Sequence, residues 1–197
     1  MNALSYNIRG LGGVGKKRHL RELVMKEKVD FLAIQETKLG GIDKKISRTV
    51  WGSDEVEWVA KDALGLSGGI ACFWNSKVIR ATRVLEGEHY IGIEGIWHPE
   101  NEPVFLINVY SPCQLSRKRV LWVELRQLIQ NGGDKWCIMR DFNSVTKAEE
   151  RKGNSGVTTD MREFGSFIQD MELVDIPLVG RKFTWYQASG NYTSIID

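Results

Sequence analysis

Short apolar runs, separated by turns rich in glycine, asparagine and proline, recur along the chain and predict many β-strands. The first run covers 3–8, and a second, 31–34, ends in a Gln-Glu-Thr segment. Between them Leu20, Leu23 and Val24 recur at helical spacing, which predicts a helix. A strand, a helix and a second strand in this order favour a crossover unit with parallel strand pairing.

The middle of the chain is richer in strands than either end. Turn-forming residues separate five runs of strand type, namely 56–61, 69–74, 78–85, 90–97 and 104–110. Strands at such even spacing with short turns between them are typical of an antiparallel meander.

Two later segments have helical periodicity. The first covers about 116–131, and the glycine pair at 132–133 ends it. The second begins near Asp160, where Glu163 three residues later resembles a capping box. The run at 136–141 between the helices, and the segments 182–186 and 194–197, complete the set of predicted strands. This order of elements predicts an α/β layered domain.

Composition limits the class of protein. A chain of 197 residues suits one domain, 1–197, and a hydrophobic share of 42% excludes a disordered chain. No apolar run reaches the roughly 18 residues that a membrane span needs. The first residues lack a secretion signal, so we expect an intracellular protein. We also expect a monomer. Cys72, Cys113 and Cys137 lack disulfide or zinc spacing, which predicts free thiols, and a net charge of +2 neither requires nor excludes nucleic acid.

A carboxylate and a carboxamide follow the apolar run at 136–140. Asp141 and Asn143 are two residues apart, so in extended backbone their side chains point to the same face. Such a pair can bind a cation or orient a water molecule. The alternative is an Asx turn, because Asp and Asn readily bond the local backbone at strand ends.

Three other predicted strands also end in residues that can take part in chemistry. Asn7, Glu36 and Tyr110 stand at these positions. Mg²⁺ prefers oxygen ligands and is usually held by one or two carboxylates, which Glu36 and Asp141 can supply. Taken singly, each residue has a structural alternative: a turn former, a helix cap and a half-buried aromatic, respectively. Their occurrence together favours an active site.

Eight segments in a fixed order resemble a known family over nearly the whole chain. They are NIRGLG (7–12), QETK (35–38), SGGIA (67–71), NVYSP (108–112), DFN (141–143), LVD (173–175), GRKFTW (180–185) and SIID (194–197). This order resembles the endonuclease/exonuclease/phosphatase superfamily, and within it the apurinic-like endonuclease domain of plant LINE-type (non-LTR) retrotransposons.

The resemblance implies a DNase I-like fold, a four-layer α/β sandwich of two mixed β-sheets flanked by helices. It also implies a hydrolase that nicks DNA with Mg²⁺, or alternatively Mn²⁺. By the same resemblance Glu36 ligates the metal with help from Asn7. Asp141 positions or deprotonates the attacking water, Asn143 orients the water and the phosphate, and Tyr110 contacts the phosphate.

Contacts with DNA are implied by a second set of residues. Arg181, Lys182 and Trp185 resemble the groove-contacting hairpin of the retrotransposon enzymes, with cations for phosphates and an aromatic ring for unstacked bases. Lys38 flanks a motif loop, as do Lys16, Lys17, Arg18 and Lys147. An ordinary solvated basic face is the alternative for these flanking cations.

Two departures from the family pattern bear on activity. Arg140 stands where the family has glycine, and it either crowds the cleft or reaches outward to a phosphate. The family also ends in a strand with an Asp–His pair, whereas this sequence ends at Asp197, the counterpart of an acid that fixes the histidine. We therefore expect a domain that is incomplete at the C-terminus, lacks its final strand and has impaired activity.

Two alternatives remain open at this stage. One is a catalytically inert relic with residual nucleic-acid binding, and the other is a phosphatase acting on a soluble phosphoester. The preferred interpretation implies DNA as partner, a reverse-transcriptase domain in a longer reading frame, and a nuclear location if genomic DNA is the substrate.

Overall fold

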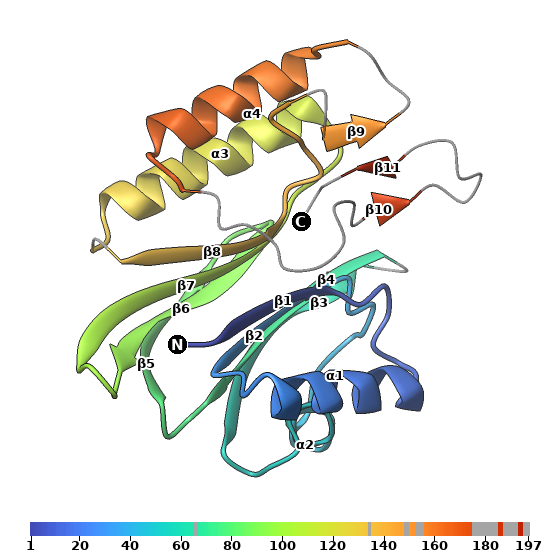
Figure 1. Ribbon diagram of the computed structural model, residues 1–197, viewed down its shortest axis with the longest axis vertical. Helices are drawn as coiled ribbons and strands as arrows, with labels where there is room; N and C mark the ends of the chain where they lie inside the picture. The colour runs from blue at the N-terminus through green and yellow to red at the C-terminus, as the bar shows by residue number, and fades with distance from the viewer. Residues whose placement is uncertain are drawn as a thin grey trace. The chain divides into compact units, whose positions relative to one another are not determined.

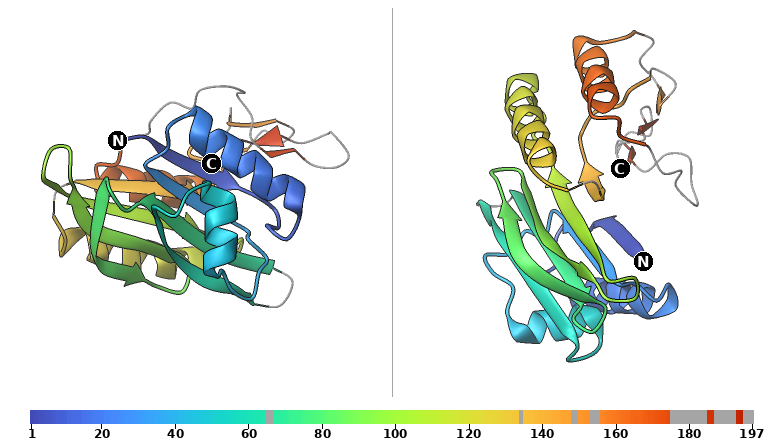
Figure 2. Two further views of the ribbon diagram at one scale, coloured as in Figure 1. Left: turned by 90° about the horizontal axis from the view of Figure 1, so that it is seen from below. Right: turned by 90° about the vertical axis from the view of Figure 1, so that its left-hand side faces the viewer.

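The computed structural model describes residues 1–64, 67–133, 135–147, 150–152, 156–174, 185–186 and 193–194 (Figures 1 and 2). The chain divides into two compact units. Unit 1 comprises Met1–Tyr110 with Gln127–Arg140, and unit 2 comprises Ser111–Arg126 with Asp141–Asp197. Each unit is described by itself below.

Unit 1 contains a first sheet of four strands, in the order β1-β2-β4-β3. The strands are β1 (Ala3–Asn7), β2 (Phe31–Gln35), β3 (Val56–Leu64) and β4 (Ser67–Asn75). β1 and β2 pair in parallel, which confirms the predicted crossover, whereas β4 is antiparallel to both of its neighbours. β2 is buried at all five positions because both of its faces are covered.

Two helices, α1 (Val14–Lys26) and α2 (Lys44–Trp51), cover one face of this sheet (Figure 1). Leu20 and Val24 of α1 and Val50 of α2 share a buried cluster with Leu32 and Ile34 of β2. The helix α2 was not predicted from the sequence. The helix begins where the Asp43 side chain accepts a hydrogen bond from the Ile46 N–H, at 2.7 Å.

The second sheet has the order β5-β6-β7-β8. Its strands are β5 (Ile79–Glu86), β6 (Tyr90–Trp97), β7 (Glu102–Tyr110) and β8 (Trp136–Asp141), the last of which reaches one residue into unit 2. β5, β6 and β7 form an antiparallel meander. The predicted meander is therefore confirmed for β5, β6 and β7. It is wrong for β3 and β4, which pair in the first sheet.

A second buried cluster joins the two sheets. Phe31 and Ala33 of β2 belong to it, whereas the intervening Leu32 and Ile34 pack on the side of the helices. This alternation follows from the two-residue period of a strand. The two mixed sheets flanked by helices confirm the predicted fold class.

A buried amide crosses between the sheets. Asn108 of β7 is fully buried, and its Nδ2 donates to the carbonyl oxygens of Ile34 in β2 and Ala71 in β4, both at 3.0 Å. Its Oδ1 accepts a hydrogen bond from Nε2 of Gln35, at 2.7 Å. This single side chain thus bonds to both central strands of the first sheet.

Unit 2 is built around α3 (Leu115–Gln130), of which residues 115–126 belong to this unit, and α4 (Thr159–Asp170). Their core is an aromatic cluster of Trp122, Phe142, Phe164 and Phe167, with ring centroids 5.0–6.3 Å apart.

The predicted start of α4 is wrong by two residues. The cap is Thr158, whose Oγ1 accepts a hydrogen bond from the Met161 N–H, at 3.2 Å. Asp160 and Glu163 instead pair with α3, through Lys118 and Arg119. Two hydrogen bonds from Arg119 lower the pKa of the Glu163 carboxyl. The two residues of the expected capping box therefore connect α4 to α3.

Three short strands, β9 (Arg151–Lys152), β10 (Trp185–Tyr186) and β11 (Thr193–Ser194), form a third sheet in the order β10-β11-β9. β10 and β11 overlap the predicted strands 182–186 and 194–197, whose other residues lie outside the described part. The three cysteines are free, as predicted, and burial raises the pKa of the Cys72 and Cys137 thiols. In the described residues, no helix is both long and apolar enough to cross a membrane.

The substitution Asn108→Ala is expected to destabilise the protein by about 3 kcal/mol or more. It removes three hydrogen bonds and leaves the Gln35 amide and two carbonyl groups buried without this partner. Urea denaturation followed by tryptophan fluorescence measures the loss. Asn131→Ala, at the exposed end of α3, is the matched control and should change the free energy of unfolding by less than about 0.5 kcal/mol. Equal effects of the two substitutions would contradict the role given to Asn108.

Candidate functional site

The ends of the parallel strands β1 and β2 bring two predicted site residues together. Asn7 is the last residue of β1, and Glu36 directly follows β2. Because the strands are parallel and in register from Ala3↔Phe31 to Asn7↔Gln35, their carboxyl ends lie side by side. Nδ2 of Asn7 donates a hydrogen bond to Oε1 of Glu36, at 3.0 Å. The Glu36 side chain retains 19% exposure.

The backbone around Glu36 adopts left-handed conformations. Glu36 has φ of 54°, and Arg9 and Lys38 have φ of 48° and 52°. Such angles are unfavourable for residues with a Cβ, so surrounding contacts must impose them. The Glu36 carbonyl accepts a hydrogen bond from the Gly10 N–H, at 2.7 Å, and the neighbouring Thr37 N–H donates to Gly69, at 2.9 Å. The loop therefore fixes the backbone from which the Glu36 side chain extends.

The glycines of the 67–71 motif have a structural reason. Gly68 and Gly69 have φ of +77° and +79°, and a Cβ on Gly69 would lie 2.3 Å from Oγ1 of Thr37. Only a residue without a side chain permits this close approach of β4 to the segment that carries Glu36. The motif thus supports the segment that carries Glu36.

Two lysines contact the strand-end loops. Nζ of Lys38, a predicted DNA contact, lies 3.6 Å from Oε2 of Glu36, and the side chain is 41% exposed. Nζ of Lys16 donates to the carbonyl oxygens of Ile8 and Arg9, at 2.8 and 2.7 Å. Lys16 therefore holds the loop after β1.

The residues at these strand ends fit a hard divalent cation with few protein ligands. Glu36 offers a carboxylate on a partly exposed side chain, and Mg²⁺ is commonly held by one or two carboxylates together with water. Oδ1 of Asn7 accepts from the Arg9 N–H, at 3.2 Å, so in this arrangement Asn7 orients Glu36 through its Nδ2. Among the described residues, no three His, Cys, Asp or Glu side chains cluster as a metal site.

Tyr110 is the last residue of β7 and also belongs to unit 1. Its backbone N–H donates to the His89 carbonyl, at 2.9 Å, and its ring packs, partly buried, against the cluster between the sheets. Tyr110 lies two residues after Asn108, so the same strand carries the amide that crosses between the sheets and the phenol predicted to contact phosphate.

In unit 2, Asp141 and Asn143 form the local turn that the sequence left open as an alternative. The Asn143 N–H donates to Oδ1 of Asp141, at 3.2 Å, and Asn143 has φ of 51°. Nδ2 of Asn143 donates to the Ser111 carbonyl, at 2.7 Å, and the Ser111 N–H donates to the Asp141 carbonyl, at 2.8 Å. Asp141 is 2% exposed. The turn fixes both side chains, which is compatible with a catalytic role.

Sequence reasoning missed a buried lysine beneath this turn. Nζ of Lys118 donates to the Asn143 carbonyl and to Oγ of Ser144, at 2.8 and 2.7 Å, and to both oxygens of Asp160. Lys118 is only 2% exposed. The sequence could have indicated this burial, because Lys118 lies on the helix face that also buries Leu121, Trp122 and Leu125. A cation on an apolar stripe indicates a buried partner.

The remaining predicted residues contribute less to the described structure. Arg181, Lys182 and Asp197 lie outside the described residues. Trp185 belongs to β10, and only its backbone is described. Arg140, which stands where the resembling family has glycine, lies half-buried in β8.

The substitution Lys118→Met is expected to destabilise unit 2 by about 3–5 kcal/mol, because it leaves the Asp160 carboxylate without its main buried partner. Urea denaturation measures the loss, and Lys147→Met, at an exposed lysine, is the control. The double substitution Lys118→Met with Asp160→Leu should lose less than the sum of the two single losses. Additive losses would show that the two side chains act independently.

Comparison with known proteins places the chain in a family. Residues 4–192 match the Endonuclease/Exonuclease/phosphatase family. The fold is similar to a 3'-5' exonuclease, NExo, from Neisseria meningitidis, with 16% identity and a TM-score of 0.73 over 96% of this chain and 80% of that chain. The 3' phosphatase NExo from Neisseria, bound to product DNA hairpin, has 16% identity and a TM-score of 0.71, with coverages of 95% and 79%. The AP endonuclease LMAP from Leishmania major has 18% identity and a TM-score of 0.60, with coverages of 85% and 65%. The chain belongs to the Endonuclease/Exonuclease/phosphatase family.

Proposed function

We propose that the protein is a divalent-metal-dependent phosphodiesterase that nicks DNA, with Mg²⁺, or alternatively Mn²⁺, as the metal. The observation that carries the proposal is the Glu36 carboxylate, held by Asn7 at the ends of two parallel strands. Family membership supports hydrolysis of a phosphoester. The structural neighbours described as nucleases, and the one bound to a DNA hairpin, favour DNA.

The proposal gives each unit its own part of the chemistry. In unit 1, Glu36 would hold the metal with help from Asn7, which orients the carboxylate, and a bound metal would neutralise charge that grows on the phosphoryl oxygens. The Tyr110 phenol donates a hydrogen bond to a phosphate oxygen. Fixed groups of this kind stabilise the transition state without reorganising during the reaction.

In unit 2, Asp141 accepts the proton of the attacking water, and Asn143 orients the water and the phosphate. The turn that joins these residues holds both side chains before substrate arrives, which lowers the entropic cost of reaching the reactive geometry. Lys118 donates a hydrogen bond to the Asn143 carbonyl and is therefore a positioning residue in this scheme.

The order of motifs supports a finer assignment, to the endonuclease domain of a LINE-type retrotransposon. The partners proposed on this basis are DNA and a reverse-transcriptase domain in a longer reading frame, and the proposed location is the nucleus if genomic DNA is the substrate. Arg140 in place of the glycine of resembling enzymes supports reduced turnover. The exposed Lys38 beside Glu36 is proposed to contact the DNA backbone, and Arg181, Lys182 and Trp185 are proposed to contact the groove.

The substitution Glu36→Gln is expected to lower nicking of supercoiled plasmid by on the order of 10³-fold, equivalent to about 4 kcal/mol, because it removes the proposed metal carboxylate. EDTA should abolish nicking, and Mg²⁺ should restore it. Glu22→Gln, an exposed glutamate on α1, is the control and should retain full activity. A Glu36→Gln protein that nicks like the parent would refute the metal assignment.

The substitution Asp141→Asn is expected to lower kcat by about 10²–10⁴-fold, because an amide cannot accept the proton of the water. Mg²⁺ affinity, followed by tryptophan fluorescence, should stay the same. If affinity falls instead and excess Mg²⁺ restores the rate, Asp141 is a metal ligand and the two roles must be exchanged. A 3'-phosphorylated oligonucleotide in the same assay shows whether the monoester is the better substrate.

A further inference from the structure

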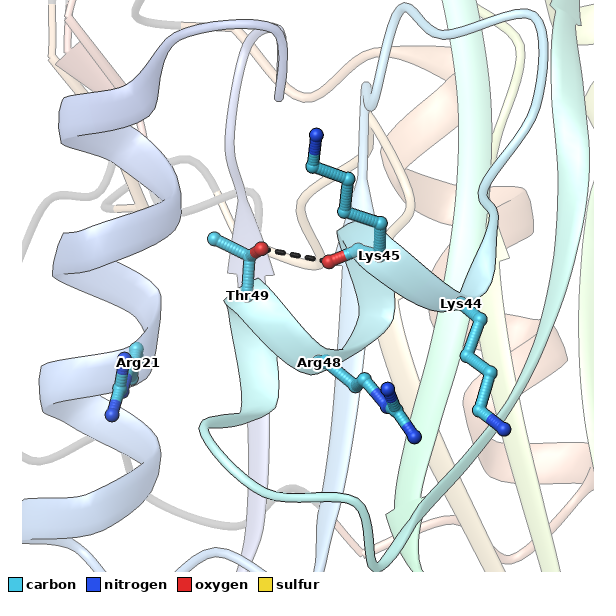
Figure 3. A pocket seen from close by; sticks show the side chains of 5 residues that line it. All are labelled: Arg21, Lys44, Lys45, Arg48 and Thr49. Atoms are coloured by element: carbon cyan, nitrogen blue, oxygen red, sulfur yellow. Dashed lines mark hydrogen bonds between the residues drawn. The ribbon is translucent and has the colours of Figure 1, made fainter.

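An open groove rich in cations lies between α1 and α2 in unit 1. Arg21, Lys44, Lys45, Arg48 and Thr49 line it, and its volume is about 510 Å³ (Figure 3). All five residues are exposed. Neither Asn7 nor Glu36 contributes to this surface, which is called the basic groove below.

The two helices concentrate positive charge that the chain as a whole does not have. α1 has five Lys or Arg residues and one Glu, and α2 has three Lys or Arg residues and no acid, which gives a net +7. The whole chain has a net charge of only +2, so the rest of the chain must be net negative. The acids that flank the helices, Glu27, Asp43 and Asp54, lower this local charge to +4, which still creates a positive potential that attracts anions.

In the described residues, Arg48 is the only one of the four groove cations that forms an ion pair. The Asp43 side chain accepts the hydrogen bond that caps α2, Asp54 pairs with Arg48, and Glu22 pairs with Arg18 on α1. In the described part of the chain, no carboxylate forms an ion pair with Arg21, Lys44 or Lys45. These three cations therefore remain available to an external anion.

Two of the cations are held in place by the fold. The Arg21 side chain packs against the glycine that ends α2, where a Cβ on Gly52 would lie 2.9 Å from Nε of Arg21. Asp54 fixes the guanidinium of Arg48. Figure 3 shows Lys44 and Arg48 extending to the same side of α2, with Arg21 on the neighbouring α1. Contacts within the protein therefore restrict the Arg21 and Arg48 side chains.

We infer that the basic groove binds the phosphate backbone of duplex DNA, at a surface separate from the strand ends that carry Asn7 and Glu36; this inference rests on DNA as the substrate of the proposed function. Its lining is cationic and contains no aromatic residue, so it suits phosphates and not stacked bases. Its open shape suits an extended polyanion. Such contacts strengthen binding independently of sequence, and their strength falls as salt rises.

The test measures binding of a fluorescein-labelled DNA duplex by fluorescence anisotropy, in EDTA, over a range of salt concentrations. The groove variant carries Lys44→Gln and Lys45→Gln. The matched control carries Lys77→Gln and Lys135→Gln, which remove the same charge at exposed lysines of unit 1. The groove variant should bind about tenfold more weakly at low salt, and its slope of log K against log salt should be smaller by about 2. The control should bind nearly as the parent does.

Equal losses in both variants, or no loss in either, would overturn the proposal. Saturable competition by inorganic pyrophosphate that removes all DNA binding would also overturn it, because the groove would then be a site for small anions. Thermal unfolding shows whether both variants are folded. No hydrolysis is measured, so failure here is distinguishable from failure of the proposed activity. The converse also holds, because Glu36→Gln leaves the groove intact.

Discussion

The hydrogen bonds of Asn108 are the constraint on which the geometry of unit 1 depends. Apolar contacts between two sheets tolerate sliding, because they are non-directional. The amide of Asn108 accepts and donates at fixed positions on β2 and β4, and any slip would leave these groups buried without partners. The register matters for chemistry, because Gln35 immediately precedes Glu36 and Asn108 lies two residues before Tyr110. A core polar contact thus sets where the strand-end side chains emerge.

In unit 2, a buried charged group has the role that the Asn108 amide has in unit 1, because its hydrogen bonds fix the position of a functional segment. The ammonium group of Lys118 is buried, and the Asp160 carboxylate, the Ser144 hydroxyl and the Asn143 carbonyl surround it. The carbonyl belongs to a residue in the left-handed region, so the lysine stabilises a backbone conformation that asparagine tolerates better than most residues. The turn carrying Asp141 and Asn143 therefore rests on a helix packed by aromatic side chains.

Much of unit 1 could be predicted from sequence, because its strands are apolar runs between clear turn residues. The parallel pairing of β1 and β2 followed from the intervening helix. The helix α2 was missed because it has only eight residues and four of them are lysine, serine or arginine, although Asp43 and Gly52 marked its ends. Assignment of β3 and β4 to a different sheet from β5 was not predictable, since hairpins look alike whichever sheet they join.

The candidate site, like the fold, could be predicted from the sequence only in part. Strand-end positions identified Asn7, Glu36, Tyr110, Asp141 and Asn143 as candidates, but long-range partners could not be read from local patterns. Asp160 and Glu163 have the spacing of a capping box, yet cations on α3 attract both carboxylates, and Thr158 remains to cap the helix. Lys118 was missed for the same reason, because its three partners are 25, 26 and 42 residues away in sequence.

The left-handed backbone at Glu36 places activity and stability in opposition. A non-glycine residue in this conformation costs about 1–3 kcal/mol, and glycine would relieve that strain. Selection for stability alone would therefore favour loss of the carboxylate at this position. The glutamate at this position therefore supplies a carboxylate at a cost to the folding free energy of the chain.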